Sequence, residues 1–237
     1  MSFPLDMKDK ELVMIILTRS RSGYEAIFLD RQLVLQVMYK HLQAKSKVLT
    51  DKRLVDVDHS SQGVTVHCQD GSSYTGDILV GADGTYSAVR QQMWKVADIA
   101  QPGFISTGER QRLTSEYQVL FGISSATKGL ECGNYDITYM QDISTMVIVG
   151  KNHTVYWFLF RKLDRVYRVG EIPRYTRKEA EVFAEKHIHI NIESEPKVTF
   201  GDIWKHRKYY TLAATEEASY KNWTFGRIAC LGDSVHK

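Results

Sequence analysis

The sequence predicts an α/β fold that is interrupted by a mostly antiparallel, β-rich insert, and three observations support this. Helix and strand patterns alternate with turn signals in the first part of the chain. Strand-like, aromatic segments then predominate. Near the end of the chain a second buried-strand pattern marks a return to the α/β pattern. Both buried-strand patterns run into glycine and aspartate. We therefore expect three divisions, which comprise residues 1–98, 99–214 and 215–237.

The first clear element is a helix that begins after Asp30, a residue type suited to the N-cap position. Its apolar residues follow i, i+4 spacing, at Leu33, Val34, Val37, Met38 and Leu42. Apolar and polar residues then alternate over residues 54–57 and 64–68, which predicts two half-buried strands. Asp70-Gly71 predicts a turn into a short strand near Tyr74.

Two strand-to-loop junctions carry the chemically interesting residues. Ile78-Leu79-Val80 is apolar throughout, which predicts a strand covered on both faces, and it runs into Gly81-Ala82-Asp83-Gly84 before a short helix over residues 87–94. Residues 227–231 run into Gly232-Asp233-Ser234 in the same way. Ligands of open α/β sheets bind beyond the carboxyl ends of strands, where glycine permits close approach and a carboxylate can accept hydrogen bonds. Each junction alone is also an ordinary turn, but together they suggest a nucleotide-like ligand.

The segment between the junctions is rich in strand patterns. Strands are expected over residues 117–123, 145–149 and 154–160, with a turn at Lys151-Asn152-His153. The composition of residues 177–187 favours a helix. Further strand candidates are residues 198–204 and 209–213.

Composition and charge exclude several classes of protein. The formal net charge is only +3 and basic residues are spread along the chain, so we expect no nucleic-acid partner. Cys68, Cys132 and Cys230 form no C-x-x-C pair, which favours a reducing cytoplasm over a disulfide framework or zinc ribbon. His187 and His189 lack a further ligand at a recognisable spacing, so no metal site is expected.

The chain as given contains no predicted membrane segment. Residues 6–11 form a charged run that speaks against a signal peptide. The longest apolar stretches, around residues 14–17 and 146–149, are too short to span a bilayer. We expect a cytoplasmic protein, with membrane association only through an anchor in a C-terminal segment outside this chain.

The two junctions together resemble the motifs of a known enzyme family. Residues 77–84, followed by Ser87, Val89 and Arg90, are similar to the DG motif of aromatic-hydroxylase-type (group A) FAD-dependent monooxygenases. Gly232-Asp233-Ser234, followed by His236, is similar to the GD motif of that family, and order and spacing agree. The stretches that resemble its fungal branch, which includes indole-diterpene and meroterpenoid epoxidases, are residues 28–32, Tyr117 with residues 121–124, and residues 156–158.

The resemblance implies a partial FAD-binding, Rossmann-like (doubly wound) domain with an inserted, mostly antiparallel β-sheet substrate domain. It also implies an oxidoreductase that uses FAD, NADPH or NADH, and molecular oxygen. Such an enzyme would insert one oxygen atom, by epoxidation or hydroxylation, into an apolar, prenylated or terpenoid small molecule of secondary metabolism. The cofactor would carry the redox chemistry while the protein orients it and excludes water.

Site residues follow from the same resemblance, and each has a structural alternative. Arg31 matches the arginine that contacts the flavin, although a first-turn arginine can simply be solvated. Asp233 matches the aspartate that binds the ribityl chain, and it can also cap a helix. Asp83 matches an acid that organises the pyrophosphate region and the nicotinamide site, or it holds a tight turn. These three are the candidate cofactor-binding residues.

Tyr139 is the candidate catalytic residue, because family members place a tyrosine near the substrate just before a strand such as residues 145–149. A phenol there can donate a hydrogen bond to the substrate. Tyr135 lies close by in the sequence and is an alternative. The run Tyr156-Trp157-Phe158 is interpreted as core in preference to a substrate-stacking surface.

The sequence also departs from the family pattern. It contains no G-x-G-x-x-G, no ribose-binding acid after such a motif and no glycine-rich loop after the GD motif. We therefore expect a chain truncated at both ends, with weakened flavin binding, since each lost charge-assisted hydrogen bond costs about 1.5–3 kcal/mol. A central sheet that lacks a strand would also have a bare edge. A fragment of a working enzyme, a decayed gene product and a non-catalytic scaffold all fit this pattern.

Three other functions share parts of the pattern. A binding module without redox chemistry would be colourless and would hold its ligand in the insert. A methyltransferase needs a glycine-rich turn after its first strand, which the sequence lacks. A flavin-dependent halogenase needs an essential lysine, and no position in the sequence identifies one.

Overall fold

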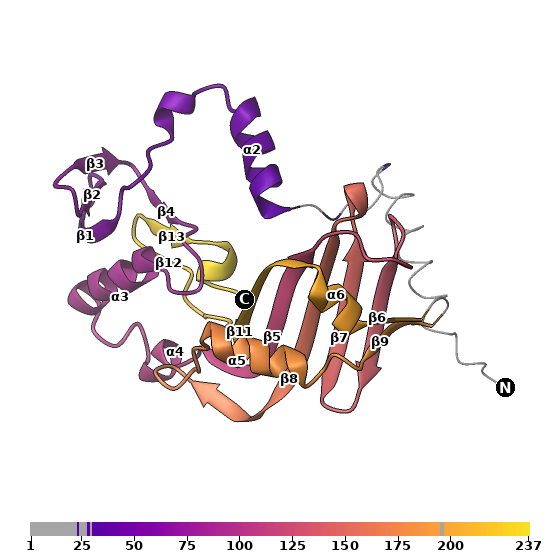
Figure 1. Cartoon of the computed structure of the whole chain (residues 1–237). Coiled ribbons are helices and arrows are strands. Elements are labelled where there is room, and N and C mark those ends of the chain that lie inside the picture. Colours follow the sequence, from indigo (N-terminus) through magenta and orange to yellow (C-terminus); the bar gives the residue numbers. More distant parts are fainter. Residues whose placement is uncertain (1–22, 24–27, 29, 195–196) are drawn as a thin grey trace.

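The computed structural model describes residue 23, residue 28 and residues 30–194 and 197–237, which form two regions with separate hydrophobic cores. Figure 1 shows a region of small sheets around α3 on one side and a five-stranded sheet on the other. The predicted α/β fold with an antiparallel β-rich insert is confirmed. The exact domain limits stay a prediction.

The first region begins with a helix and a small sheet whose formation follows from local sequence. The carboxylate of Asp30 accepts a hydrogen bond from the backbone N–H of Gln32 at 2.7 Å and caps the first helix, as predicted. No residue of that helix is buried in the described structure, despite its apolar side chains. The elements are α2 (Arg31–His41), a 3₁₀ turn η1 (Lys45–Lys47), and the antiparallel strands β1 (Leu54–His59), β2 (Val64–Cys68) and β3 (Ser73–Gly76).

A second small sheet brings the two ends of the described chain together. Strand β13 lies between β12 and β4, and it runs parallel to β4 and antiparallel to β12. Helix α3 packs on this sheet, and Met93, Ala97 and Val235 are fully buried there. The elements are β4 (Leu79–Gly81), α3 (Ala88–Ala100), α4 (Thr107–Arg110), β12 (Thr224–Phe225), β13 (Ile228–Cys230) and the 3₁₀ turn η3 (Gly232–Ser234).

The expectation that the strand at residues 78–80 is covered on both faces is wrong for the described residues. Ile78 is 65% exposed and Val80 is 46% exposed, whereas Leu79 packs against the core. The reason is that α3 covers one face of this sheet, and β4 stands at its edge. An apolar run therefore shows what a strand can bury, but it does not show that a layer is present.

The second region is an antiparallel sheet in the order β11-β5-β8-β7-β6. Residues 117–123, 145–149 and 155–160 form strands, so the predicted strands are confirmed except at Thr154, and Asn152 takes a left-handed conformation (φ 60°) in the expected turn. The elements are β5 (Thr114–Ser124), β6 (Tyr135–Met140), β7 (Ile143–Val149), the 3₁₀ turn η2 (Lys151–His153), β8 (Val155–Arg168) and β11 (Arg207–Glu217).

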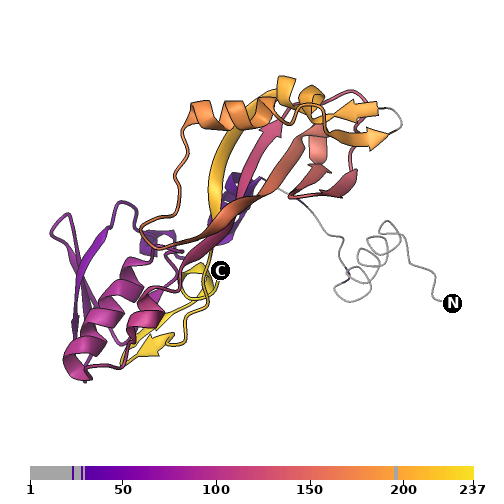
Figure 2. The same cartoon turned by 90° about the horizontal axis from the view of Figure 1, so that it is seen from below.

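Two helices cover one face of this sheet, as Figure 2 shows. These are α5 (Arg177–Glu185) and α6 (Phe200–Lys205), with a hairpin of β9 (Asn191–Ser194) and β10 (Lys197–Thr199) leading into α6. Trp157, on the sheet, and Phe200, in α6, are fully buried where the layers meet, with ring centroids 5.1 Å apart. The strand expected over residues 198–204 is wrong beyond residue 199, because Thr199 and Asp202 form a capping box that starts α6.

Candidate functional site

The two glycine–aspartate junctions lie side by side, as expected from the carboxyl ends of neighbouring parallel strands. Gly81 is paired with Cys230 in the β4–β13 register. The Gly81 carbonyl accepts hydrogen bonds from the backbone N–H of Leu231 and from the hydroxyl of Ser234, both at 2.9 Å. Ser234 is fully buried. The first loop (residues 81–87) and the second loop (residues 231–235) therefore form one structural unit.

A buried arginine on α3 forms hydrogen bonds to both loops. Arg90, on α3, is 4% exposed and donates to the carbonyl of Thr85 at 2.8 Å and to the carbonyl of Ser234. Its guanidinium lies over the rings of Tyr220 and Trp94, 4.3 and 5.4 Å from their centroids. Its Nε has no hydrogen-bond partner within the described structure. The Arg90 side chain fixes the distance between the loops by bonding to both.

Asp83, in the first loop, has both carboxylate oxygens engaged by the start of α3. Oδ1 accepts from the hydroxyl of Ser87 at 2.5 Å, and Oδ2 accepts from the backbone N–H groups of Ala88 and Val89 at 2.7 and 3.1 Å. A carboxylate at this position also interacts favourably with the helix dipole. These bonds support the tight-turn interpretation of Asp83, and its contact with a cofactor stays a prediction.

Asp233, in the second loop, is differently placed. Its side chain is 62% exposed, and its one ion pair among the described residues is with Lys237 at 3.8 Å. The neighbouring Gly232 has φ +62°, and a Cβ atom there would meet nothing within 4 Å. An exposed acceptor beside bare backbone fits the polyol of a flavin, whose hydroxyls need an acceptor and close approach.

The long strand β11 connects this loop unit to the five-stranded sheet. The hydroxyl of Tyr86, in the first loop, donates to Oε1 of Glu216 at 2.9 Å. Lys237 lies 3.8 Å from Oε2 of the same glutamate. Burial, followed by the hydrogen bond to Glu216, raises the pKa of the Tyr86 phenol. The loops and the end of β11 therefore share a set of polar contacts.

The face of the five-stranded sheet opposite α5 and α6 is aromatic. Cross-strand register places Phe121 opposite Phe158, and Phe158 opposite Met146. The rings of Phe121 and Phe158 stack at 6.0 Å, and those of Phe158 and Phe160 stack at 6.1 Å. Paired residues share a face. By register, this aromatic face comprises Phe121, Ile123, Tyr135, Ile137, Tyr139, Met146, Ile148, Tyr156, Phe158, Phe160, Tyr209 and Thr211.

The start of α2 is attached to the aromatic face and forms a cavity with it. The ring of Phe28 packs edge-on against Tyr156, with 4.9 Å between the ring centroids. Burial, with the nearby Asp30 charge, raises the pKa of Tyr156. The resulting aromatic cavity has a volume of about 580 Å³, and its lining residues are Phe28, Asp30, Arg31, Phe121, Gly122, Ile123, Tyr156, Phe158, Tyr209, Tyr210 and Thr211.

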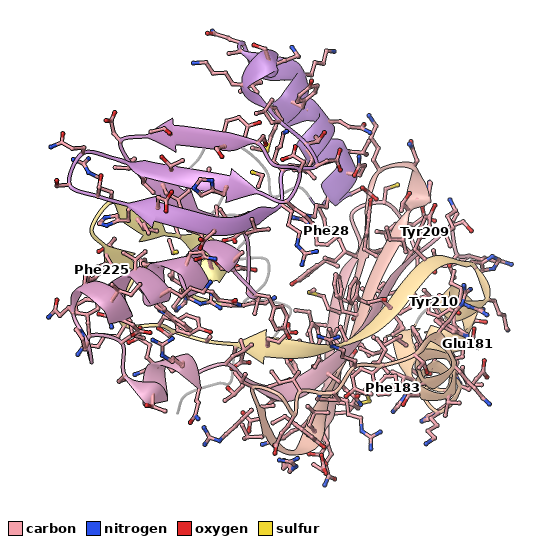
Figure 3. All side chains as sticks on the ribbon, turned by 90° about the vertical axis from the view of Figure 1, so that its left-hand side faces the viewer. Phe28, Glu181, Phe183, Tyr209, Tyr210 and Phe225 are labelled. Atoms are coloured by element: carbon pink, nitrogen blue, oxygen red, sulfur yellow. The ribbon has the colours of Figure 1, made fainter. Side chains whose placement is uncertain are left out.

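Arg31, which is predicted to contact the flavin, lies at the apolar surface of the aromatic cavity. Figure 3 shows Phe28 and Tyr209 at the same end of the molecule, away from Phe225. Arg31 lines the cavity and is exposed. A volume of this order, with an apolar floor and few polar groups, is typical of small-molecule sites.

Tyr139 lies on the aromatic face but outside the aromatic cavity. It is 65% exposed and stands on β6, the strand at the opposite edge of the sheet from β11. Tyr135 is on the same strand and the same face, four residues before Tyr139. The catalytic role of Tyr139 stays a prediction.

Sequence reasoning missed the residues that form the cavity floor. The interpretation of Tyr156-Trp157-Phe158 as core holds for Trp157 alone, because Tyr156 and Phe158 point to the aromatic face. The readable signal was the alternation along β8, in which Tyr156, Phe158 and Phe160 share one side. Tyr209 and Thr211 alternate in the same way on β11.

The structure also describes His187 and bears on the expectations for metal ligands and membrane-spanning helices. Nδ1 of His187 bonds to the Phe183 carbonyl at 2.6 Å, and burial lowers the pKa of His187. Within the part of the chain that the structure describes, no group of three or more His, Cys, Asp or Glu residues is arranged to hold a metal ion. No helix formed by the described residues is long and apolar enough to cross a membrane.

Curated relatives match along nearly the whole sequence, although no protein-family model matches it. FAD-dependent monooxygenase verC1 of Penicillium polonicum is 42% identical over 221 residues, which cover 93% of this chain and 27% of that protein. FAD-dependent monooxygenase andE of Emericella variicolor is 40% identical, with coverages of 92% and 46%. FAD-dependent monooxygenase ptmM of Penicillium ochrochloron is 38% identical, with coverages of 93% and 52%. The chain therefore spans about a quarter to a half of these relatives.

Solved structures share the fold. HpxO of Klebsiella pneumoniae, complexed with FAD and uric acid, matches with a TM-score of 0.70 at 19% identity, over 94% of this chain and 52% of that one. A salicylate hydroxylase substrate complex matches with a TM-score of 0.58 at 18% identity, over 87% and 50%. These structures show the shared fold, and the relatives at 38–42% identity show that the chain belongs to the FAD-dependent monooxygenase family and spans part of the length of its members.

Proposed function

We propose that this chain supplies a flavin-contacting loop and the substrate surface of an FAD-dependent monooxygenase in fungal secondary metabolism. The observation that carries the proposal is the exposed carboxylate of Asp233, whose one ion pair among the described residues is with Lys237 at 3.8 Å, beside the bare backbone of Gly232 at the ends of two parallel strands. Relatives named FAD-dependent monooxygenase at 38–42% identity support it, as does the fold shared with an FAD-complexed protein.

Three residues of the chain would hold the cofactor. Asp233 would accept hydrogen bonds from the ribityl hydroxyls, Gly232 would allow close approach, and Arg31 would present its cation to the flavin. When bound and reduced by NADPH or NADH, FAD supplies the chemistry that activates molecular oxygen. Asp83 and Arg90 would act on this site by holding the two loops in place.

The aromatic face would bind and orient the substrate. Its stacked phenylalanine rings, with Met146 and Ile148 beside them, favour an apolar small molecule over a charged one. A prenylated or terpenoid compound, epoxidised or hydroxylated at one carbon centre, fits such a surface. Tyr139, on the same face, is the candidate hydrogen-bond donor to that substrate.

The test is a titration of FAD into the purified chain, followed by the visible absorption spectrum. We expect a perturbed flavin band with weak, roughly millimolar affinity, because amide donors for the pyrophosphate are missing from the sequence. Asp233→Ala should weaken binding by about tenfold or more, since a charge-assisted hydrogen bond is lost. Asp56→Ala, at an exposed position on β1, is the matched control. Equal binding by Asp233→Ala and the unchanged chain would overturn the assignment.

A second candidate is a binding module without redox chemistry. It is favoured by the preformed aromatic cavity, which does not depend on the loops, and by the missing G-x-G-x-x-G. This candidate predicts that the chain binds apolar ligands and leaves the FAD spectrum unchanged. The same titration therefore separates the two functions.

A further inference from the structure

Two adjacent tyrosines on β11 have opposite surroundings. The Tyr210 hydroxyl donates to Oε1 of Glu181 at 2.6 Å and accepts from Nε of Arg177 at 2.8 Å, so it ties the strand to α5. Figure 3 shows Tyr210 and Glu181 close together, on the side of the sheet where α5 lies. Tyr209 is 72% exposed, and its hydroxyl bonds to no other described residue. Tyr210 is therefore a structural residue, whereas the hydroxyl of Tyr209 is available to a ligand.

A second free hydroxyl lies next to that of Tyr209. Tyr209 is paired with Ile123 and Thr211 is paired with Phe121, and the register is unbroken between them. Residues two apart on a strand share a face. Both Tyr209 and Thr211 line the aromatic cavity. The side chains of Tyr209 and Thr211, each with a neutral hydroxyl group, are therefore neighbours on the aromatic face and line the same cavity.

The aromatic cavity also contains polar groups of Asp30, Arg31 and Tyr156. The carboxylate of Asp30 accepts from the backbone N–H of Gln32 at 2.7 Å, and the ring of Tyr156 packs edge-on against Phe28. Arg31 is assigned to the flavin under the proposed function. The exposed neutral hydroxyls of Tyr209 and Thr211 are then well suited to orient a substrate, and each can donate and accept.

We infer that the substrate of this site is an uncharged apolar ring system that carries a hydroxyl or carbonyl oxygen, and that Tyr209, assisted by Thr211, is the positioning residue that recognises this oxygen. The inference rests on the proposed function in taking the cavity ligand to be the substrate and in assigning Arg31 to the flavin. The rings of Phe121 and Phe158 would contact the apolar body of that ligand. A neutral oxygen function matches two neutral donors without burying an unpaired charge.

The test compares two probes of the same shape, 2-naphthol and 2-methylnaphthalene, titrated into the full chain without flavin and followed by calorimetry. The measured quantity is the ratio of their dissociation constants. In Tyr209→Phe this ratio should shift against 2-naphthol by about threefold to tenfold, since one neutral hydrogen bond is lost. The affinity for 2-methylnaphthalene should stay the same. Thr211→Val, which keeps the side-chain shape, should shift the ratio in the same direction by a smaller factor.

Tyr117→Phe is the matched control, because Tyr117 is an exposed tyrosine on β5 that does not line the cavity. The ratio of the two dissociation constants in Tyr117→Phe should equal that of the unchanged chain. Melting curves should show that all variants are folded. An unchanged ratio in Tyr209→Phe would overturn the inference, and so would a chain that binds neither probe. Because no flavin is present, a failure of FAD binding is seen in a different experiment and does not alter this result.

Discussion

The first and second loops follow neighbouring parallel strands and both contain Gly and Asp, yet their carboxylates are used differently. Asp83 bonds to Ser87, Ala88 and Val89 at the start of α3. Asp233 is 62% exposed and lies 3.8 Å from Lys237. The same pair of residue types therefore supports a helix in one loop and leaves an acceptor free in the other.

This difference teaches that a strand-end aspartate can be assigned only from what its oxygens already bond. A carboxylate filled by backbone N–H groups stabilises the protein, whereas a free one can bind a ligand without weakening the fold. Arg90 and Ser234 hold the two loops at a fixed spacing. Four substitutions test this division, in order of decreasing expected effect on stability.

The largest effect is expected from Arg90→Met. The substitution removes the charged donor from the buried carbonyl of Ser234 and the partly buried carbonyl of Thr85. The free energy of unfolding should fall by about 2–4 kcal/mol in urea denaturation, because both acceptors lose a charged partner. Arg112→Met is the control, since exposed Arg112 makes one bond to the Ser219 carbonyl at 3.2 Å. Equal stability of the two variants would show that Arg90 does not hold the loops together.

Asp83→Ala should lower the free energy of unfolding by about 1–2 kcal/mol, as the loss of a helix cap does. Amide hydrogen exchange at Ala88 and Val89 should accelerate in the same variant, because their acceptor is gone. Asp83→Asn keeps one acceptor oxygen and should lose less. If Asp83→Ala has the stability of the unchanged chain, the cap interpretation is wrong.

Ser234→Ala should lower the free energy of unfolding by about 1 kcal/mol. Its buried hydroxyl donates to the Gly81 carbonyl at 2.9 Å and lies 2.7 Å from the Leu231 carbonyl. Thermal denaturation of this variant beside Ser219→Ala, at an exposed position, provides the comparison. A loss as large as that of Arg90→Met would mean that the serine, and not the arginine, is the main link between the loops.

Asp233→Ala should change the free energy of unfolding by less than about 0.5 kcal/mol, as exposed substitutions usually do. The reason is that its ion pair with Lys237 is long and exposed. Urea denaturation of this variant and of Asp83→Ala under the same conditions checks the contrast. A loss above about 1 kcal/mol would remove the distinction between the two loops.

The sequence predicted the features that depend on a few neighbouring residues. The cap at Asp30, the strands of the insert and the two glycine–aspartate junctions are of this kind, because their signals lie within one turn or strand. The helix α6 was also readable, since Thr199 and Asp202 have the spacing of a capping box, but it was interpreted as a strand.

Features that depend on packing between distant segments could not be predicted. The exposure of Ile78 and Val80 depends on which layers cover β4, and the strand pattern does not contain this information. The aromatic cavity depends on the register of β11, β5 and β8, which brings Tyr209 next to residues far away in the sequence. The different uses of Asp83 and Asp233 depend on the helix that follows only one of them.

Backbone amide chemical shifts during an FAD titration test the division between the two loops most directly. We expect Gly232 and Asp233 to shift in proportion to bound FAD, and Ala88 and Val89 to stay within the small changes of the rest of α3. In Asp233→Ala the shift at Gly232 should disappear at the same FAD concentrations. Shifts at Ala88 and Val89 with none at Gly232 would contradict the account, because they would place the ligand at the first loop and make Asp83 the carboxylate that binds it.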